Sequence, residues 1–202
     1  MSIITVSREF GSGGREVGKR LADILGYSYY DREIVTEIAK KTQLDENYVA
    51  HSLEKGNLGH LPINFGRTFS YPSVIMTDAV NLFSEQHRII KELAQKGNCV
   101  IVGRAADVIL KDYNPIKLFV YADKKSKLER CKERGVSNNN ISDKALEKEI
   151  KKIDEQRAKY HELFSDIGWG KKEGYHLCIN TTDRDIKELV ASLAEYIKFL
   201  VK

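Results

Sequence analysis

The sequence is poor in cysteine and has no long hydrophobic run. Its three cysteines, Cys99, Cys131 and Cys178, are widely spaced and include no CxxC pair. This spacing argues against a disulfide framework or a zinc site, and the apolar neighbours of Cys99 and Cys178 predict buried thiols. No apolar stretch approaches the ~20 residues that a membrane-spanning helix needs. The first residues also lack the basic and apolar regions of a secretory signal, so we expect a cytoplasmic protein that does not contact membranes.

Charge is nearly balanced, which limits the class of partner. The chain has 33 basic and 29 acidic residues, a net charge of +4. This excess is too small to indicate a nucleic-acid-binding protein, but it suits an anionic small molecule if the arginines converge. The five histidines show no HxxxH or similar ligand spacing, so no metal site within the protein is expected. Oligomeric state is not indicated by the sequence.

The 202 residues, 42% of them hydrophobic, are typical of one globular domain. Short runs rich in valine and isoleucine predict strands at 3–6, 99–102, 117–121 and 177–180. Apolar residues at helical spacing predict a first helix that ends at Gly26. Further helices are expected at 31–40, 45–54, 74–96, 124–134, 142–165 and 183–201, and a loop at 56–72. Strands separated by helices indicate an α/β fold, with a parallel sheet flanked by helices on both faces.

A glycine-rich stretch, Gly11-Ser12-Gly13-Gly14, lies between the first strand and the first helix. In α/β proteins this arrangement binds phosphate, because glycines let backbone N–H groups approach the anion and the helix N-terminus adds partial positive charge. The alternative is a turn whose glycines only permit close packing. The order of strand, glycine loop and helix favours the phosphate site.

Two frames of the P-loop pattern GxxxxGK[ST] compete in this stretch. Residues 13–20 (GGREVGKR) nearly fit, but Val17 and Leu21 already belong to the helix, which would place Lys19 a full turn inside it. In the frame that we prefer, the loop runs over residues 8–13. Gly14 then stands in the place of the lysine, and Arg15 is expected to contact phosphate instead.

Five spaced blocks resemble the cytidylate-kinase-like branch of the P-loop nucleoside monophosphate kinases. They are residues 7–16 (SREFGSGGRE), 30–34 (YDREI), 102–107 (VGRAAD), 154–160 (DEQRAKY) and 175–181 (YHLCINT). The resemblance covers nearly the whole chain. It implies a three-layer P-loop kinase fold over residues 1–202, with an acceptor-binding helical insertion at 30–96 and a helical lid at 135–170. It also implies ATP as phosphoryl donor, Mg²⁺ and nucleotide substrates.

The resemblance assigns an acceptor site to four residues: Asp31, Arg32, Arg104 and Asp154. Arg104 matches the arginine that holds the acceptor phosphate, and its place just after a strand agrees with that role. The aspartate that usually follows is Ala105 here, and Asp107 is the nearest substitute. Asp31 opens the insertion, although a helix N-cap is an equal alternative for it.

The resemblance assigns the donor phosphates to Gly11, Ser12, Gly13, Gly14, Arg15, Arg130 and Arg134. Asp154 and Arg157 match the Asp-x-x-Arg of the lid and lie three residues apart on one helix face. The implied catalytic residues are Arg15, Arg104 and Arg157, all of them cations for the phosphoryl group. A solvated helix face is the alternative for Arg130 and Arg134.

The sequence therefore predicts ATP-dependent phosphoryl transfer to a nucleoside monophosphate, with CMP or dCMP first. A small-molecule kinase on the same scaffold is one alternative, because acceptor pockets change more easily than the phosphate loop. A nucleotide-binding protein with little catalysis is another, since the loop lacks its usual lysine and hydroxyl. A dinucleotide-dependent oxidoreductase is disfavoured, because Gly11-x-Gly13 lacks the third glycine of GxGxxG.

Overall fold

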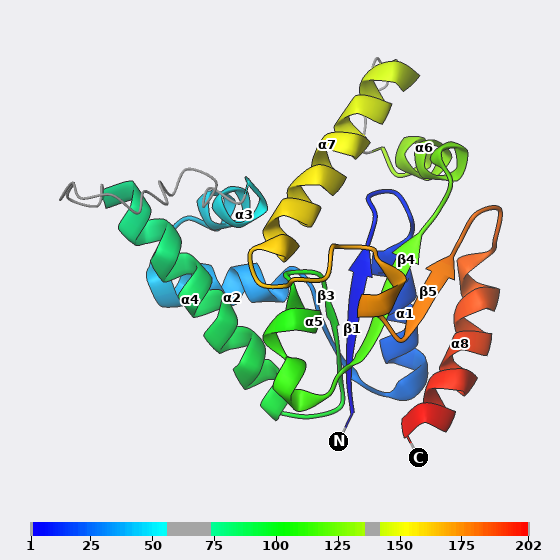
Figure 1. Cartoon of the computed structure of the whole chain (residues 1–202), viewed down its shortest axis with the longest axis horizontal. Helices are drawn as coiled ribbons and strands as arrows, with labels where there is room; N and C mark the ends of the chain where they lie inside the picture. The colour runs from blue at the N-terminus through cyan, green and yellow to red at the C-terminus, as the bar shows by residue number, and fades with distance from the viewer. Residues whose placement is uncertain (1, 56–73, 136–141, 202) are drawn as a thin grey trace.

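A computed structural model describes residues 2–55, 74–135 and 142–201. Its centre is one sheet of five parallel strands in the order β2-β3-β1-β4-β5 (Figure 1). The strands are β1 (Ile3–Arg8), β2 (Ser28–Tyr30), β3 (Cys99–Val102), β4 (Ile116–Tyr121) and β5 (Leu177–Asn180). The predicted parallel sheet is confirmed. The three-residue strand β2 was not predicted, because it is too short to show a pattern.

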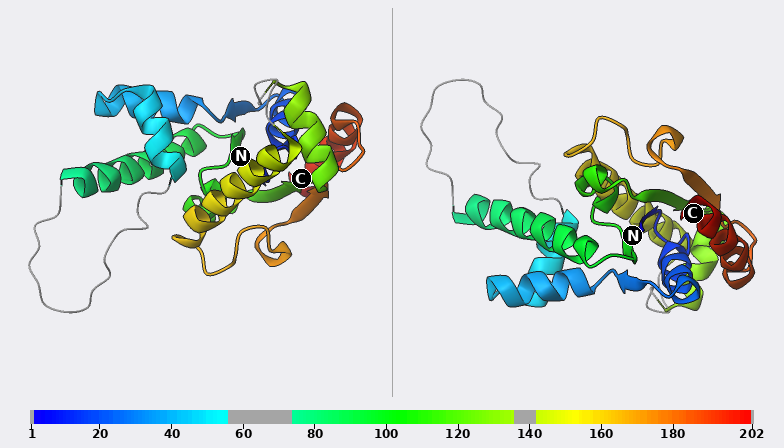
Figure 2. Two further views of the ribbon diagram at one scale, coloured as in Figure 1. Left: turned by 90° about the horizontal axis from the view of Figure 1, so that it is seen from above. Right: turned by 90° about the horizontal axis from the view of Figure 1, so that it is seen from below.

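Helices cover both faces of this sheet (Figures 1 and 2). They are α1 (Gly14–Leu25), α2 (Glu33–Thr42), α3 (Glu46–Lys55), α4 (Val74–Gln95), α5 (Ala106–Ile109), α6 (Lys124–Glu133), α7 (Asp143–Glu162) and α8 (Ile186–Val201). The described residues also contain two 3₁₀ turns, η2 (Lys111–Tyr113) and η3 (Lys172–Gly174). The predicted helices are present with ends shifted by a few residues, and only the single-turn α5 was missed. The predicted loop at 56–72 lies outside the described residues.

Alternating side chains of β1 divide the core between the two faces of the sheet. Ile4 and Val6 pack with α1 and α8, whereas Ile3 packs with α2, α4 and α5. The alternation of a strand sends successive side chains to opposite faces, so Arg8 continues the row of Ile4 and Val6 toward α1. This is why a charged residue at the end of β1 meets the start of α1.

The three cysteines differ in burial according to where each lies in the fold. Cys99, in the inner strand β3, is buried as predicted, and Cys131 in α6 is buried as well. Cys178 is exposed, so that prediction is wrong. It lies in the edge strand β5, whose residues alternate between half-buried and exposed because one face of that strand is left uncovered.

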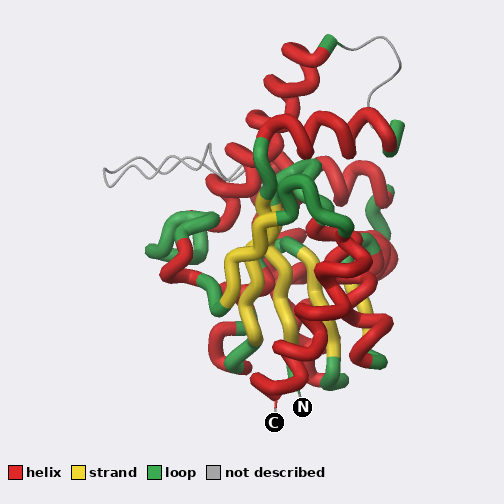
Figure 3. The backbone as a smooth tube through the Cα atoms, turned by 90° about the vertical axis from the view of Figure 1, so that its right-hand side faces the viewer, coloured by secondary structure: helices red, strands yellow, loops and turns green. Residues whose placement is uncertain are grey.

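The carboxyl ends of the strands point toward α6 and α7, while the chain ends lie at the opposite end of the sheet (Figures 1 and 3). In α/β sheets, ligands bind beyond the carboxyl ends of the strands. No helix among the described residues is both long and apolar enough to cross a membrane.

Candidate functional site

A cavity of about 720 Å³ lies at the carboxyl end of the sheet. Its walls include Gly11, Gly13 and Gly14 of the loop. Seven arginines also line it: Arg8, Arg15, Arg32, Arg104, Arg130, Arg134 and Arg157. The loop residue Ser12, together with Asp31 and Asp154, does not line the cavity but contacts residues that do. Most of the predicted site residues are thus brought together, from segments far apart in the chain.

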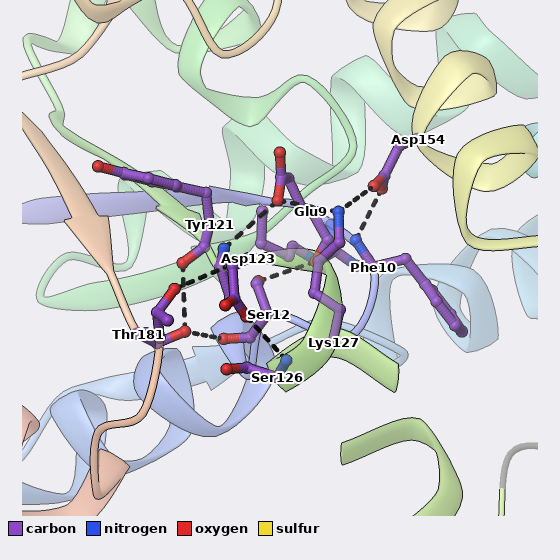
Figure 4. Close-up of polar contacts among 12 residues, drawn as sticks. Glu9, Phe10, Ser12, Tyr121, Asp123, Ser126, Lys127, Asp154 and Thr181 are labelled. Carbon is purple, nitrogen blue, oxygen red and sulfur yellow. Dashed lines mark hydrogen bonds and ion pairs between the residues drawn. The ribbon is translucent and has the colours of Figure 1, made fainter. Parts of the chain in front are cut away.

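Hydrogen bonds hold the glycine loop from below (Figure 4). The buried Ser12 hydroxyl donates to the Glu9 carbonyl oxygen at 2.8 Å. The Thr181 hydroxyl, just past β5, donates to the Ser12 carbonyl oxygen at 2.7 Å, and Arg130 donates to Thr181 in turn. The Ser12 side chain therefore shapes the loop and faces away from the cavity, which leaves the loop backbone as the surface for an anion.

Helix α1 begins at Gly14, directly after the loop, and its N-cap Gly13 has a positive φ of 79°. The N-cap residue Gly13 has no side chain to cap the helix, and the Gly14 N–H donates to Ser12 Oγ at 3.4 Å. The helix end, with its partial positive charge, lies beside the cavity that Gly13 and Gly14 line. Lys19 lies inside α1, is exposed and pairs with Asp23 at 2.8 Å. The rejection of the frame that uses Lys19 is confirmed.

Asp31, just after β2, lies between two arginines, Arg8 at the end of β1 and Arg15 in the first turn of α1. One of its oxygens is 2.6 Å from Arg15 Nε, and the other is 3.6 Å from Arg8 Nη2. It does not cap α2: Arg32 occupies the N-cap position without a side-chain hydrogen bond, and Glu33 accepts from the Asp31 N–H at 3.0 Å. The capping alternative for Asp31 is therefore wrong, and its carboxylate orients cations at the cavity wall.

Arg8 was not predicted as a site residue, although it lies against the cavity with only 14% of its side chain exposed. Burial, together with the charges of Arg157, Arg15 and Arg104 and against the opposing effect of Asp31, lowers the pKa of Arg8 to about 9. Arg8 stays charged at neutral pH. The cavity thus holds more positive charge than its own carboxylates balance, which favours an anionic ligand. Its position could have indicated it, since Arg8, like Arg104, lies at the carboxyl end of a strand.

The segment after β3 has an unusual backbone. Gly103, Arg104 and Ala105 have consecutive positive φ values of 75°, 60° and 49°. For the two residues that carry a Cβ, such left-handed conformations cost of order 1–3 kcal/mol each and are concentrated at functional sites. This turn places Arg104 on the cavity wall.

Asp107 does not take the place of the missing aspartate. It is buried, accepts from the Ser7 hydroxyl at 3.3 Å, and lies 2.7 Å from His161 Nε2. The suggestion that Asp107 replaces the aspartate missing at position 105 is wrong, because its buried carboxylate is already bonded to Ser7 and His161. The serine contacts the aspartate and not the histidine, so the three residues do not form a Ser-His-Asp catalytic triad.

Helix α7 is attached to the loop through its two predicted site residues. Asp154 accepts from the Phe10 N–H at 2.7 Å and pairs with Lys127 at 3.4 Å, as Figure 4 shows. Arg157 donates to the Arg8 carbonyl oxygen at 3.0 Å and lies over the Phe10 ring, 5.5 Å from its centre. Burial raises the pKa of Asp154, partly offset by its bond from Phe10 and by the nearby cations. Helix α7, which lies in the predicted lid, is thus in contact with the glycine loop.

Two further contacts were missed by sequence reasoning. Lys127 of α6 bridges Asp154 and Glu9, the latter at 3.1 Å, and thereby ties α6 to both α7 and the loop. Arg134, at the end of α6, pairs with Glu16 of α1 at 2.6 Å. A bridging lysine is invisible in a sequence, because its partners lie 118 and 27 residues away.

Within the described ranges, no three His, Cys, Asp or Glu side chains gather as a metal site. Lys127 pairs with two carboxylates beside the loop, those of Glu9 in the loop and Asp154 in α7. Mg²⁺ typically binds through one or two carboxylates together with substrate phosphates. Because both carboxylates here are paired with a lysine, the site suits Mg²⁺ bound to the phosphates of a nucleotide better than Mg²⁺ held by the protein alone.

A sequence model of the cytidylate kinase-like family matches residues 3–183. Among solved structures, the chain is similar to an uncharacterized protein from Eubacterium ventriosum, with 27% identity, a TM-score of 0.70, and coverage of 98% of this chain and 99% of the other. Shikimate kinases from Bacteroides thetaiotaomicron and Acinetobacter baumannii also match, the latter determined in complex with shikimate. Their TM-scores are 0.59 and 0.56, their identities 15% and 16%, each covers 98% of this chain, and the coverage of those chains is 98% and 93%. A search of curated proteins gave no significant match. Matched over most of its length, the chain belongs to the cytidylate kinase-like family and has the P-loop kinase fold.

Proposed function

We propose that this protein transfers the terminal phosphoryl group of ATP to a nucleoside monophosphate, with CMP or dCMP as the preferred acceptor. One observation carries the proposal: seven arginines line a single cavity whose base is the glycine loop. Phosphoryl transfer needs little covalent chemistry from the protein, and it depends on positioning and on neutralising the phosphate charge. Convergent arginines beside a phosphate loop fit that demand.

The residues divide the cavity between donor and acceptor. Gly11, Gly13 and Gly14 would hold the donor phosphates through the loop backbone, with Arg130 and Arg134 on the α6 side. Arg32 and Arg104, beyond the carboxyl ends of β2 and β3, would hold the acceptor phosphate. Mg²⁺ would enter on the phosphates of ATP and neutralise part of their charge.

Arg157 and Arg15 complete the site between the two halves. Arg157 lines the cavity beside the loop and would stabilise the charge of the phosphoryl group in transit. Arg15, held by Asp31, lies in the first turn of α1 and would contact the same group from below. Closure of α7 over the site would exclude water, which otherwise competes as acceptor.

A small-molecule kinase is the second candidate, and a specific observation favours it. The acceptor site has Ala105 where an aspartate would contact a base, and Asp107 is sequestered by His161. The shikimate kinases with the same fold carry a non-nucleotide acceptor in one of their structures. A nucleotide-binding role with little catalysis is the third candidate.

A coupled ADP-release assay over a panel of acceptors tests these candidates. The panel contains CMP, dCMP, UMP, AMP, GMP and shikimate, and thermal shifts are recorded with each compound and with ATP. Fastest turnover with CMP or dCMP supports the proposal, and turnover only with shikimate or another non-nucleotide supports the second candidate. Binding of ATP without turnover of any acceptor would contradict both. Arg157→Ala, purified in parallel, is the control for contaminating kinases.

A further inference from the structure

The glycine loop differs from the common P-loop at positions 8, 14 and 15, and the first two of these positions are in contact in the structure. In the frame that the structure confirms, GxxxxGK[ST] places its first glycine at Arg8 and its lysine at Gly14. The lysine of that pattern reaches the β- and γ-phosphates. In this chain the arginine Arg8 stands where the pattern has its first glycine, and Gly14 stands where the pattern has its lysine.

The stem of Arg8 occupies the space that a side chain at position 14 would fill. An ideal Cβ on Gly14 would collide with Arg8 Cβ and would lie 2.9 Å from Arg8 Cγ. Gly14 has ordinary helical backbone, as the first residue of α1. Glycine is therefore required at position 14 for space and not for conformation, and the residue that takes the space is Arg8.

The charged end of Arg8 extends across the neighbouring strand. A Cβ on Gly103 would lie 2.8 Å from Arg8 Cζ, so the guanidinium fills the place of that missing side chain. Gly103 follows β3, and its N–H donates to the Val6 carbonyl oxygen of β1 at 2.9 Å. The Arg8 guanidinium thus lies next to Arg104, between the glycine loop and the proposed acceptor site.

We infer that Arg8 takes the role of the P-loop lysine, and that its guanidinium contacts the transferred phosphoryl group from the start of the loop. This inference rests on the proposed phosphoryl transfer. A guanidinium presents two parallel N–H donors to phosphate oxygens, so it can hold the group while the donor bond breaks and the acceptor bond forms. Gly14 and Gly103 make room for this side chain at its two ends.

The charge around Arg8 agrees with a phosphate ligand. Arg15, Arg104 and Arg157 surround it, while Asp31 is its one ion-pair partner among the described residues, at 3.6 Å. Asp31 is closer to Arg15, at 2.6 Å, which leaves Arg8 only partly neutralised. A phosphoryl group carrying negative charge would offset the repulsion among these arginines.

The first test measures Arg8→Gln against Lys19→Gln. Lys19 is the lysine of the rejected frame and is exposed on α1, so its variant controls for the loss of a nearby positive charge. We expect Arg8→Gln to lower kcat by about 10²–10³-fold, the range for removing one donor to a transition-state oxyanion. The KM for ATP should rise by a smaller factor, about tenfold, because the lost bond to the terminal phosphates also contributes to binding, and Lys19→Gln should match the wild type. A kcat for Arg8→Gln within threefold of the wild type would overturn the inference.

The second test exchanges the two positions. The double variant Arg8→Gly with Gly14→Lys restores the first glycine and the lysine of the common P-loop, with Arg15 still in the place of the serine or threonine. Arg8→Gly with Gly14→Met is its uncharged control of similar size. We expect the lysine double variant to be at least tenfold more active than both the methionine double variant and Arg8→Gly alone. Equal activity in the two double variants, with equal melting temperatures, would show that Arg8 only fills space and would overturn the inference.

Calorimetric titration separates this inference from the proposed function. If the wild type phosphorylates no acceptor, the proposed function fails, and Arg8 is then judged by binding alone. We expect Arg8→Gln to weaken ATP binding at least tenfold and AMP binding less than threefold, because the contact is to the terminal phosphates. Equal weakening for ATP and AMP would overturn the inference, whatever the activity of the wild type.

Discussion

The two faces of the sheet are built differently. The core between the sheet and helices α1 and α8 is apolar, with fully buried residues such as Ile4, Leu21 and Ile197, and the charged Arg8 lies at its cavity end. The face covered by α2, α4, α5 and the end of α7 contains buried polar pairs, Asp107 with His161 and Gln86 with Tyr160. Among the described residues, all four buried polar atoms without a hydrogen-bond partner belong to this second side: Thr5 Oγ1, Gln86 Oε1, His87 Nε2 and His161 Nδ1.

This difference separates stability from function. An apolar, closely packed face holds α1, and therefore the glycine loop, in one position. The polar face carries the segments proposed to bind the acceptor and to close over it, and unpaired buried groups there lower its contribution to stability. We expect substitutions on the apolar face to change folding, and substitutions above the polar face to change kinetics.

The largest expected effect is that of Arg157→Ala on turnover. Arginines that neutralise a phosphoryl group in transit are worth about 10³–10⁵ in rate, so kcat should fall within that range while ATP binding changes little. Steady-state kinetics and ATP thermal shifts measure the two quantities. Lys152→Ala, an exposed site on the same helix, is the matched control. Equal small losses in both variants would mean that Arg157 is an ordinary surface charge.

Leu21→Ala should be the most destabilising single substitution in this set. Leu21 is fully buried between α1 and the sheet, and removing such a side chain costs about 2–5 kcal/mol of unfolding free energy. Ile24→Ala, on the same helix at 44% exposure, should cost less than about 0.5 kcal/mol. Urea denaturation measures both. The folded fraction of Leu21→Ala should keep its kcat, and a large fall in kcat would break the separation between the faces.

Arg104→Ala should act on acceptor binding more than on folding. A hydrogen bond to a charged group is worth about 1.5–3 kcal/mol, which corresponds to an increase of roughly 10–100-fold in the KM for the acceptor. Arg104→Lys should recover little, because an ammonium cannot form the two-pronged contact of a guanidinium. Kinetics at saturating ATP measure the effect. An unchanged acceptor KM in both variants would remove Arg104 from the proposed acceptor site.

The smallest expected effect is a gain in stability from Thr5→Val. The Thr5 hydroxyl is buried without a partner among the described residues, and valine has nearly the same shape. Removing the unpaired hydroxyl should raise the unfolding free energy by about 1 kcal/mol, with kcat unchanged. Urea denaturation with Thr5→Ser as control measures it. Destabilisation by Thr5→Val would show that the Thr5 hydroxyl makes a stabilising hydrogen bond, and would contradict the expected cost of unpaired polar groups on this face.

Local patterns in the sequence determined most of the fold. The β-branched runs of β1, β3 and β4 and the spacing of Val17 and Leu21 predict strands and helix, because burial of alternating or helical faces is a local property. The same reasoning places Gly14 at the start of α1 and excludes Lys19 from the loop. The family resemblance then pointed to six of the seven arginines that line the cavity and missed Arg8.

Only the tertiary structure decided which groups meet. The sequence left Asp31 open between a helix N-cap and a site residue, and the structure shows its carboxylate paired with Arg15 and Arg8. The sequence offers Asp107 as the nearest substitute for the aspartate missing at position 105. In the structure its carboxylate contacts His161, 54 residues away, in the core. The exchange of a lysine at 14 for an arginine at 8 is likewise visible only where the Arg8 stem crosses Gly14. Pairings across long separations depend on how strands and helices pack, and no local pattern in the sequence records which side chain occupies a shared space.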